Sequence, residues 1–205
     1  TYTLSDKLSL RSLPTIFFIN KDLIITDITV GAIKFSDNID FLKYHFNYDE
    51  NNFASVNVKK LEDAYKETHV GKKMVDFELE DNTGDIYKSS VDANKKRMIV
   101  FIDTNCDACK AIETSLTKIE EKYPKIIVKR IAGQRKEIIN DYLNENNLKH
   151  KVLTDPTGKV MSKMYGVNFV PTILFINEEN IIEDVIIGET DGDKILTKVE
   201  QWNNN

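Results

Sequence analysis

The stretch "MIVFIDTNCDACKAIETSLTKIEEKYP" (residues 98–124) joins a strand pattern to a helix pattern and contains both cysteines of the chain. Its first six residues, 98–103, are apolar apart from the last and are typical of a buried strand. Helical spacing follows from about Cys106 to Tyr123, and Pro124 ends it. Both cysteines of the chain therefore lie where a strand passes into a helix.

The spacing of the two cysteines gives them different expected roles. Cys106 falls at the predicted helix N-terminus, where unpaired N–H groups and the helix dipole stabilise a thiolate and lower its pKa below about 8.5. Cys109 continues an apolar stripe with Ile112, Leu116 and Ile119, so its sulfur is expected to face the core. We predict Cys106 as the nucleophile and Cys109 as the resolving thiol.

Two other interpretations of the cysteine pair stay open. A closed zinc site needs four ligands, but the chain has no further cysteine, and His45, His69 and His150 do not cluster in sequence. An inert buried pair is the second alternative. The position between strand and helix favours redox chemistry over both, and no metal or other cofactor is expected.

Segments with strand and helix patterns alternate on both sides of this stretch. Upstream lies a short strand around 75–79; downstream lie a strand over 125–131, a helix over 135–147, a strand over 151–155, a turn over 155–158 and a short helix around 160–165. This alternation predicts an α/β fold with right-handed crossovers, in which both faces of a sheet with parallel strands are covered.

An internal repeat extends the pattern to the N-terminal part. Without a gap, "SLPTIFFINKDLIITDITVG" (12–31) aligns with "FVPTILFINEENIIEDVIIG" (169–188). Each copy has two apolar strands around a polar turn, which predicts a β-hairpin, and a helical pattern follows each, around 39–46 and 195–202. Two units of hairpin plus helix share one design.

The repeat suggests three parts. They are a partial unit over 1–50, a connector over 51–69 that is helical around 59–68, and a complete domain over 70–205. An open sheet of ~50 residues would expose an unpaired strand edge and an apolar face. The partial unit is therefore expected to pack against a preceding half outside this sequence, against the complete domain, or against a second chain through self-association.

Composition narrows the class of protein. The chain has 205 residues, 41% hydrophobic and 30% charged, which is typical of a globular protein, and no apolar run approaches the ~18 residues of a membrane span. A net charge of −5 and short basic clusters argue against nucleic-acid binding. No signal peptide opens the sequence, so membrane attachment would need an anchor outside it.

Three segments around the cysteines resemble a known family: "VGKKMVDFELEDNTGDIYK" (70–88), "VLTDPTGKV" (152–160) and "YGVNFVPTILFIN" (165–177). Together with the Cys-x-x-Cys helix they resemble the thioredoxin superfamily, in particular the TlpA-like extracytoplasmic thiol–disulfide oxidoreductases. The resemblance implies a thioredoxin-like fold, disulfide-containing protein substrates and a redox partner protein. It also implies a periplasmic or cell-surface location, with the cytoplasm as an open alternative.

The resemblance further implies a substrate-binding loop. Pro171 should follow a cis peptide bond, with Val170 and Thr172 beside it. The backbone of Val170 would lie next to the sulfurs and pair with a substrate strand. An ordinary edge-strand proline is the alternative, since only about 5–6% of X-Pro bonds are cis.

The acidic residues that would shuttle a proton in the family are replaced in this sequence. The buried acid of many thioredoxins would fall at Val100, and the helix glutamate of TlpA-like proteins at Ile112, so neither is present. Glu113 or Asp103 are the candidate substitutes. Exposure on the helix surface is the simpler expectation for Glu113, because one residue rotates a side chain by about 100°.

The residues next to the cysteines depart from the family. Asn105 replaces the usual Trp, and Asp107 with Ala108 stands between the cysteines, where a Pro is frequent. A negative charge beside the thiolate disfavours it, which opposes the helix N-terminus. We therefore expect a weakly acidic nucleophile and a reducing potential.

Three functions compete at this point. The first is an enzyme that reduces or exchanges disulfides through Cys106 and Cys109. The second is a non-catalytic binding or scaffold module that uses the surface near Pro171. Peroxidase chemistry is a third and weaker hypothesis, because Thr104 stands two residues before Cys106 rather than three.

Overall fold

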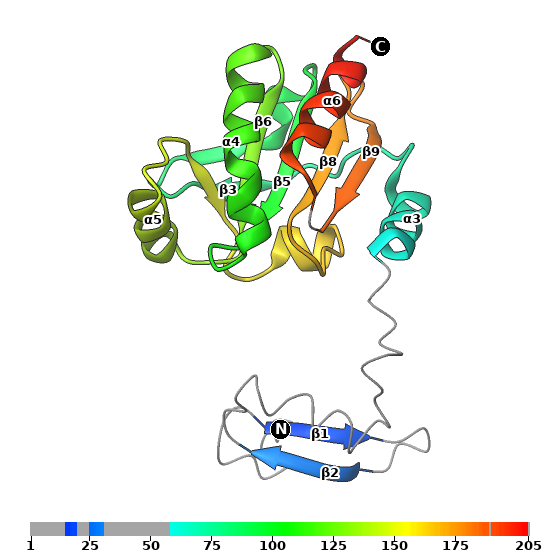
Figure 1. Cartoon of the computed structure of the whole chain (residues 1–205), viewed down its shortest axis with the longest axis vertical. Coiled ribbons are helices and arrows are strands. Elements are labelled where there is room, and N and C mark those ends of the chain that lie inside the picture. The colour runs from blue at the N-terminus through cyan, green and yellow to red at the C-terminus, as the bar shows by residue number, and fades with distance from the viewer. Residues whose placement is uncertain (1–14, 20–24, 31–57, 189, 205) are drawn as a thin grey trace. The chain divides into compact units, whose positions relative to one another are not determined.

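The computed structural model describes residues 15–19, 25–30, 58–188 and 190–204 (Figure 1). The chain divides into two compact units, Thr1–Ser55 and Val56–Asn205. Within the described residues, no helix has the length and apolar character needed to cross a membrane.

A five-stranded mixed sheet forms the centre of the second unit, in the order β7-β6-β5-β8-β9. The strands are β5 (Arg97–Ile102), β6 (Ile127–Ala132), β7 (Val152–Thr154), β8 (Thr172–Ile176) and β9 (Ile182–Ile187). Strands β5, β6 and β7 are parallel, whereas β8 runs antiparallel to β5 and β9 antiparallel to β8. The predicted sheet with parallel strands is confirmed.

Helices cover the first face of this sheet. They are α4 (Asp107–Lys122), α5 (Lys136–Glu145) and α6 (Gly192–Asn203), and Figure 1 shows α4 and α6 side by side in front of the strands. Alternation along β5 explains the packing, because Met98, Val100 and Ile102 join the core beneath these helices. Ile99 and Phe101 point into a second core on the opposite face.

The second core is closed by irregular and short elements. Met74 and Phe77 lie in it, as do Val160 and Tyr165 at the two ends of a π-helical segment, Lys159–Met164. A two-stranded hairpin, β3 (Glu78–Glu80) and β4 (Ile86–Lys88), adjoins this region, and a 3₁₀ turn, Ser89–Asp92, leads into β5.

Segments that precede β5 in the sequence cover both edges of the five-stranded sheet. Helix α3 (Val58–His69) contacts β9, and Glu62 Oε2 accepts a hydrogen bond from the backbone N–H of Ile187 at 3.1 Å. At the other edge, Asp81 forms a β-bridge with Leu153 in β7. The helix expected around 59–68 is thus present, and it packs within the second unit.

The first unit contains a hairpin, β1 (Thr15–Ile19) and β2 (Ile25–Val30), which pair antiparallel. Its register repeats that of β8 and β9 at an offset of 157: Thr15 faces Val30 as Thr172 faces Ile187. Both hairpins also shift register before their last pair, which ends β1 and β8. The helix expected around 39–46 lies outside the described residues.

Candidate active site

The two cysteines form a disulfide where β5 passes into α4. Cys106 is the N-cap residue of α4, and Cys109 lies in its first turn, with 5.2 Å between the two Cα atoms. Cys109 is fully buried beneath the helix, while Cys106 is half-buried. Only one of the two sulfur-bearing residues is thus partly open to solvent.

Backbone groups hold Cys106 in the cap position. The N–H of Cys109 donates to Cys106 Sγ at 3.1 Å, and the N–H of Cys106 donates to the carbonyl oxygen of Asp103 at 3.1 Å. Asp103 Oδ1 in turn accepts the N–H of Asn105 at 2.8 Å, which fixes the loop before the helix. A sulfur that already accepts an N–H bond at a helix N-terminus is well placed to carry negative charge.

The loop before β8 lies beside this sulfur. The Val170–Pro171 peptide bond is cis, and the carbonyl oxygen of Val170 lies 3.7 Å from Cys106 Sγ. Thr172 Oγ1 donates to the carbonyl oxygen of Phe169 at 2.7 Å, which ties the two ends of the loop together. The structure therefore brings the backbone of Val170 next to Cys106, with Pro171 and the buried Thr172 directly after it.

The two aspartates near the disulfide differ from Glu113 in their exposure. The Asp107 side chain is 98% exposed and lies 3.6 Å from Lys110 Nζ, so water and the lysine weaken its field at Cys106. Asp103 is half-buried in the loop before α4. Neither carboxylate lies on the buried face of α4 that carries Cys109.

Glu113 is buried, which contradicts the expectation of an exposed side chain. Its Oε2 accepts a hydrogen bond from Arg130 Nε at 2.9 Å, and the exposed fractions of the two side chains are 5% and 1%. The reason is that Arg130 points from β6 to the face covered by α4, so the buried surface of this helix extends past Ile112 to Glu113. Burial raises the pKa of Glu113, and Arg130 offsets part of that rise.

Arg130 was missed from sequence, although a signal for it exists. It is a charged residue within the strand pattern "KIIVKRI", and Glu113 and Glu120 are seven residues apart, which places them on one face of a helix. Arg130 binds both glutamates. Its Nε donates to Glu113, and its two terminal nitrogens lie 3.2 and 3.1 Å from the carboxylate oxygens of Glu120.

The two histidines in the described part of the chain lie away from a metal-binding arrangement with the cysteines. His69 stacks on Tyr65 with 3.9 Å between ring centroids, His150 lies near Glu113, and His45 is outside the described residues. In the described part of the chain, no group of three or more His, Cys, Asp or Glu side chains is arranged to hold a metal ion.

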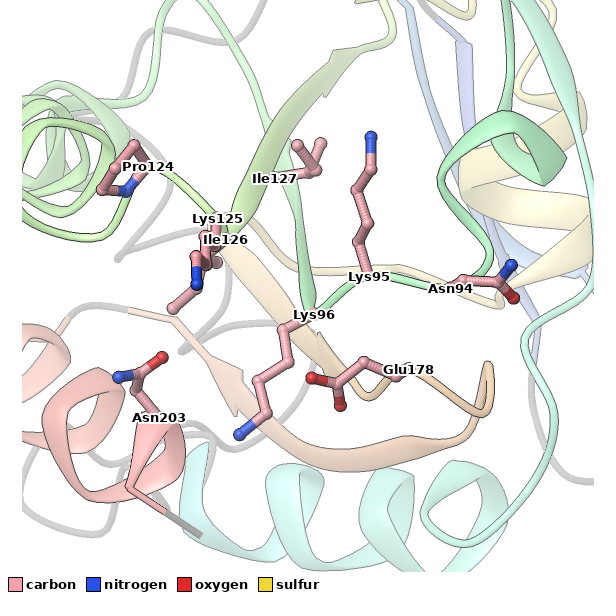
Figure 2. A pocket seen from close by; sticks show the side chains of 9 residues that line it. All are labelled: Asn94, Lys95, Lys96, Pro124, Lys125, Ile126, Ile127, Glu178 and Asn203. Atoms are coloured by element: carbon pink, nitrogen blue, oxygen red, sulfur yellow. The ribbon is translucent and has the colours of Figure 1, made fainter.

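A pocket of about 500 Å³ lies at the other end of the sheet. Its lining includes Lys95 and Lys96 before β5, Lys125 before β6, and Asn203 at the end of α6 (Figure 2). Because Cys106 follows the C-terminal end of β5, this pocket is separate from the disulfide.

Comparisons with known proteins identify the fold. Similar solved structures include the exposed lipoprotein thioredoxin Etrx1 of Streptococcus pneumoniae, which is 26% identical with a TM-score of 0.52 over 62% of this chain and 99% of its own. A secreted Mycobacterium tuberculosis disulfide oxidoreductase homologous to E. coli DsbE is 19% identical, with a TM-score of 0.55 over 61% of this chain and 95% of its own. For StoA from Bacillus subtilis the values are 18%, 0.52, 61% and 96%.

The predicted thioredoxin-like fold is confirmed by these structures. No curated protein matches the sequence. A family model described as a thioredoxin-like domain matches residues 85–202, which is more than half of the 205 residues. The chain therefore belongs to the family of thioredoxin-like domains.

Proposed function

We propose that the chain is a thiol–disulfide oxidoreductase that cycles Cys106 and Cys109 between a disulfide and a dithiol. The observation that carries the proposal is the asymmetry of the pair. Cys106 caps α4 and is half-buried, whereas Cys109 is fully buried. A substrate therefore reaches Cys106, and Cys109 acts only from within the protein.

In the reducing direction, the thiolate of Cys106 attacks one sulfur of a substrate disulfide. A mixed disulfide forms, and the other substrate sulfur leaves as a thiolate. Cys109 then gives up its proton and attacks the sulfur of Cys106, which releases the second substrate thiolate. Two electrons pass to the substrate, and Cys106 and Cys109 end as the disulfide. A redox partner protein restores the dithiol.

The loop before β8 positions the substrate in this scheme. The backbone of Val170 lies beside Cys106, with 3.7 Å between the Val170 carbonyl oxygen and Cys106 Sγ. An extended substrate segment can form backbone hydrogen bonds with Val170, as an added strand does at a sheet edge. The substrate disulfide then faces Cys106. Pro171 and Thr172 hold this backbone in place, the latter through its bond to Phe169.

Glu113 is our candidate for the group that accepts the proton of Cys109. The two residues are four apart on α4, a spacing that brings Cβ atoms within about 5–6 Å on one helix face, and both are buried. Asp103, the alternative, is half-buried in the loop before α4, and its carboxylate accepts a hydrogen bond from the N–H of Asn105.

A location outside the cytoplasm is supported by the proteins that this chain resembles. One is described as secreted and another as an exposed lipoprotein. Disulfide-containing proteins persist in such oxidising compartments, so they are the proposed substrates.

The domain organisation extends this proposal. Hairpins β1–β2 and β8–β9 share sequence, register and the position of the register shift. We propose that residues 1–50 are the C-terminal half of a second thioredoxin-like domain, joined through 51–69 to the redox domain, and that self-association through this half is one way to complete it.

A trapping experiment tests the catalytic roles. With Cys109→Ser, Cys106 still attacks but nothing displaces it, so a mixed disulfide with an oxidised peptide accumulates and is seen by intact mass. Cys106→Ser is the matched control and forms no adduct, because Cys109 is buried. If both variants trap equally, or neither does, the assigned roles are wrong; a scaffold function then becomes the better account.

A further inference from the structure

Polar side chains from four parts of the fold lie close together around Glu113, on the buried face of α4. Glu113 comes from α4, Arg130 from β6, Tyr142 from α5, and His150 from the segment before β7. Arg130 binds Glu113 at 2.9 Å, and His150 Nε2 lies 3.7 Å from Glu113 Oε2. The His150 side chain is 12% exposed, so the cluster is nearly shielded from solvent.

Three buried polar atoms of the cluster have no hydrogen-bond partner among the described residues. They are Glu113 Oε1, His150 Nε2 and the hydroxyl oxygen of Tyr142. With the ring proton of His150 on Nδ1, Nε2 is an acceptor like the carboxylate oxygen, so in this tautomer the two cannot pair with each other. A proton on Glu113 would supply a donor between these two acceptors, since His150 Nε2 lies 3.7 Å from Glu113 Oε2.

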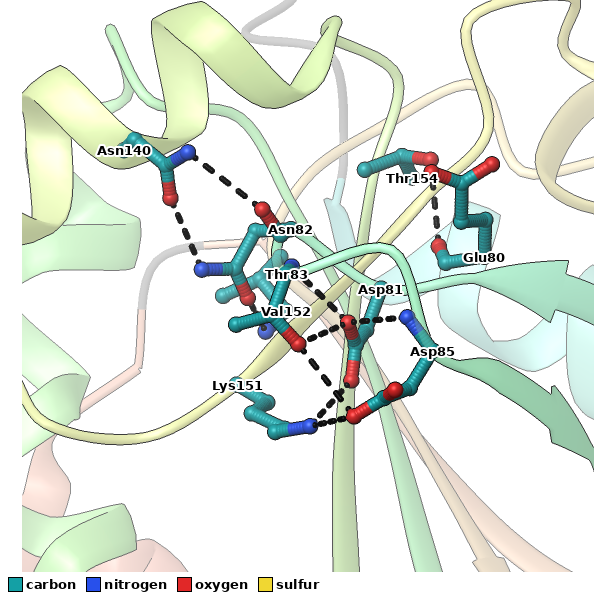
Figure 3. Close-up of polar contacts among 9 residues, drawn as sticks. All are labelled: Glu80, Asp81, Asn82, Thr83, Asp85, Asn140, Lys151, Val152 and Thr154. Carbon is teal, nitrogen blue, oxygen red and sulfur yellow. Dashed lines mark hydrogen bonds and ion pairs between the residues drawn. The ribbon is translucent and has the colours of Figure 1, made fainter.

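One side of the cluster faces the redox centre and the other faces a pocket. Glu113 follows Cys109 by one helical turn on the same buried face. Arg130 and His150 line a pocket of about 420 Å³ to which Cys106 does not contribute. Asp81, Asp85 and Lys151, which are joined by the contacts in Figure 3, form part of its wall.

We propose that Glu113 and His150 form a proton relay that carries the thiol proton of Cys109 to water in this pocket. The inference rests on the proposed function. Glu113 takes the proton of Cys109 as the thiolate forms and attacks Cys106. Glu113 then passes the proton to His150 Nε2, while Nδ1 releases its own proton to water. One proton leaves Cys109 and one reaches solvent, and exchange with water restores the starting tautomer of His150.

The charges around the relay agree with this direction of transfer. Burial raises the pKa of Glu113 although Arg130 opposes it, so this carboxylate holds a proton more readily than an exposed one. Burial and Arg130 lower the pKa of His150 to about 3, which keeps the imidazole neutral and suits transfer by tautomer exchange. Glu120 on α4 and Tyr142 on α5 also act on Glu113 or are acted on by it. The remaining titratable groups of the pocket lining are Asp81, Asp85, Tyr87, Lys129 and Lys151.

A reaction with two phases measures the attack by Cys106 and the attack by Cys109 separately. The reduced protein is mixed with a small aromatic disulfide whose leaving thiolate is coloured. Attack by Cys106 releases the first equivalent of thiolate, and attack by Cys109 on the mixed disulfide releases the second. The first phase is an internal control, since the relay serves Cys109 alone.

The test variant is His150→Ala, and the matched control is His69→Ala on α3, where the ring stacks on Tyr65. We expect His150→Ala to slow the second phase about tenfold near neutral pH and to leave the first phase unchanged. A tenfold loss is smaller than the usual contribution of a general acid or base, because Glu113 is still present. Added imidazole should restore the second phase of His150→Ala, because the ring fits the space left beside the pocket. His69→Ala should show neither the loss nor a response to imidazole.

Each outcome decides between a relay and a structural role. An unchanged second phase in His150→Ala overturns the relay, and so does a slow second phase that imidazole does not restore. If His150→Ala does not fold, His150→Gln replaces it; its amide keeps the polarity but cannot shift tautomer, so a wild-type second phase in that variant also overturns the relay. Failure of the proposed function is distinct, because the wild-type protein would then release no second equivalent.

Discussion

At the scale of single residues, the site is built from side chains whose surroundings differ sharply over one turn of helix. Cys106 accepts an N–H bond at the start of α4, whereas Cys109 is enclosed by apolar side chains. Glu113, one turn further, is enclosed as well but meets Arg130. Burial thus has opposite consequences for neighbouring groups, because an apolar sulfur gains from it and a carboxylate needs a partner.

Asp81 shows the same rule at the hairpin between β3 and β4. Burial disfavours its charge, but hydrogen bonds from Lys151 at 2.8 Å and from Thr83 outweigh burial and hold the pKa of Asp81 well below its usual value. The backbone N–H of Asp85 donates to the same oxygen as Thr83. Figure 3 shows these bonds converging on the one carboxylate.

This arrangement predicts how stability depends on pH. A carboxyl whose pKa is lowered by folding stabilises the protein above its unfolded pKa of about 3.9, and the contribution is lost as pH falls through the lower folded value. We expect Asp81→Asn to be less stable than wild type near neutral pH, with a difference that shrinks below about pH 4. Urea unfolding over a pH series measures it; an equal difference near neutral pH and at about pH 3 would contradict the assignment.

At the scale of elements, the close contact of α4 with α6 positions the helix that carries the cysteines. Gly192 begins α6 and lies against Ser115 of α4. A Cβ atom at position 192 would collide with Ser115 Oγ and lie 3.1 Å from Ser115 Cβ. The absence of a side chain at Gly192 therefore sets how near the two helices approach.

A Gly192→Ala substitution should consequently destabilise the protein by about 1–3 kcal/mol, the usual cost of overpacking. Ser115→Ala in the same chain should recover part of the loss, because it removes Oγ but keeps Cβ. Urea unfolding of the two single variants and the double variant gives the coupling between the sites. Strictly additive effects would show that the two residues do not meet.

Sequence patterns were most informative at this scale. The alternation of strands and helices, the hairpin over 169–188 and the position of Cys106 at a strand-to-helix junction all follow from local periodicity, and the structure contains each of them. The error concerned Glu113, whose neighbour Arg130 lies 17 residues away on another element. Helical spacing gives the direction of a side chain but not what fills the space in front of it.

At the scale of the whole molecule, α3 and the chain after it complete the second unit. The hydroxyl of Tyr65 donates to the carbonyl oxygen of Tyr165 at 2.7 Å, and Lys66 pairs with Asp184 of β9 at 2.9 Å. Glu62 accepts the N–H of Ile187. The helix thus covers an edge strand whose backbone would otherwise be free to pair with another chain.

Two fragments test whether α3 belongs to the redox domain. Residues 56–205 contain the full second unit and should unfold cooperatively on their own. Residues 70–205 lack α3, so we expect a loss on the order of 2 kcal/mol and concentration-dependent association through the uncovered β9 edge. Urea unfolding and light scattering measure both. Equal stability and equal solubility of the two fragments would show that the helix is only a connector.

The Cys-x-x-Cys junction, the order of strands and helices, and the repeated hairpin could all be predicted from the sequence, because periodicity and turn residues act over a few neighbours. Three features depended on tertiary contacts: Glu113 is buried against Arg130, His150 lies beside Glu113 and lines a pocket, and α3 covers β9. These contacts join elements that are distant along the chain. A buried charge must find its partner wherever folding brings one, and no local pattern specifies which residue that is.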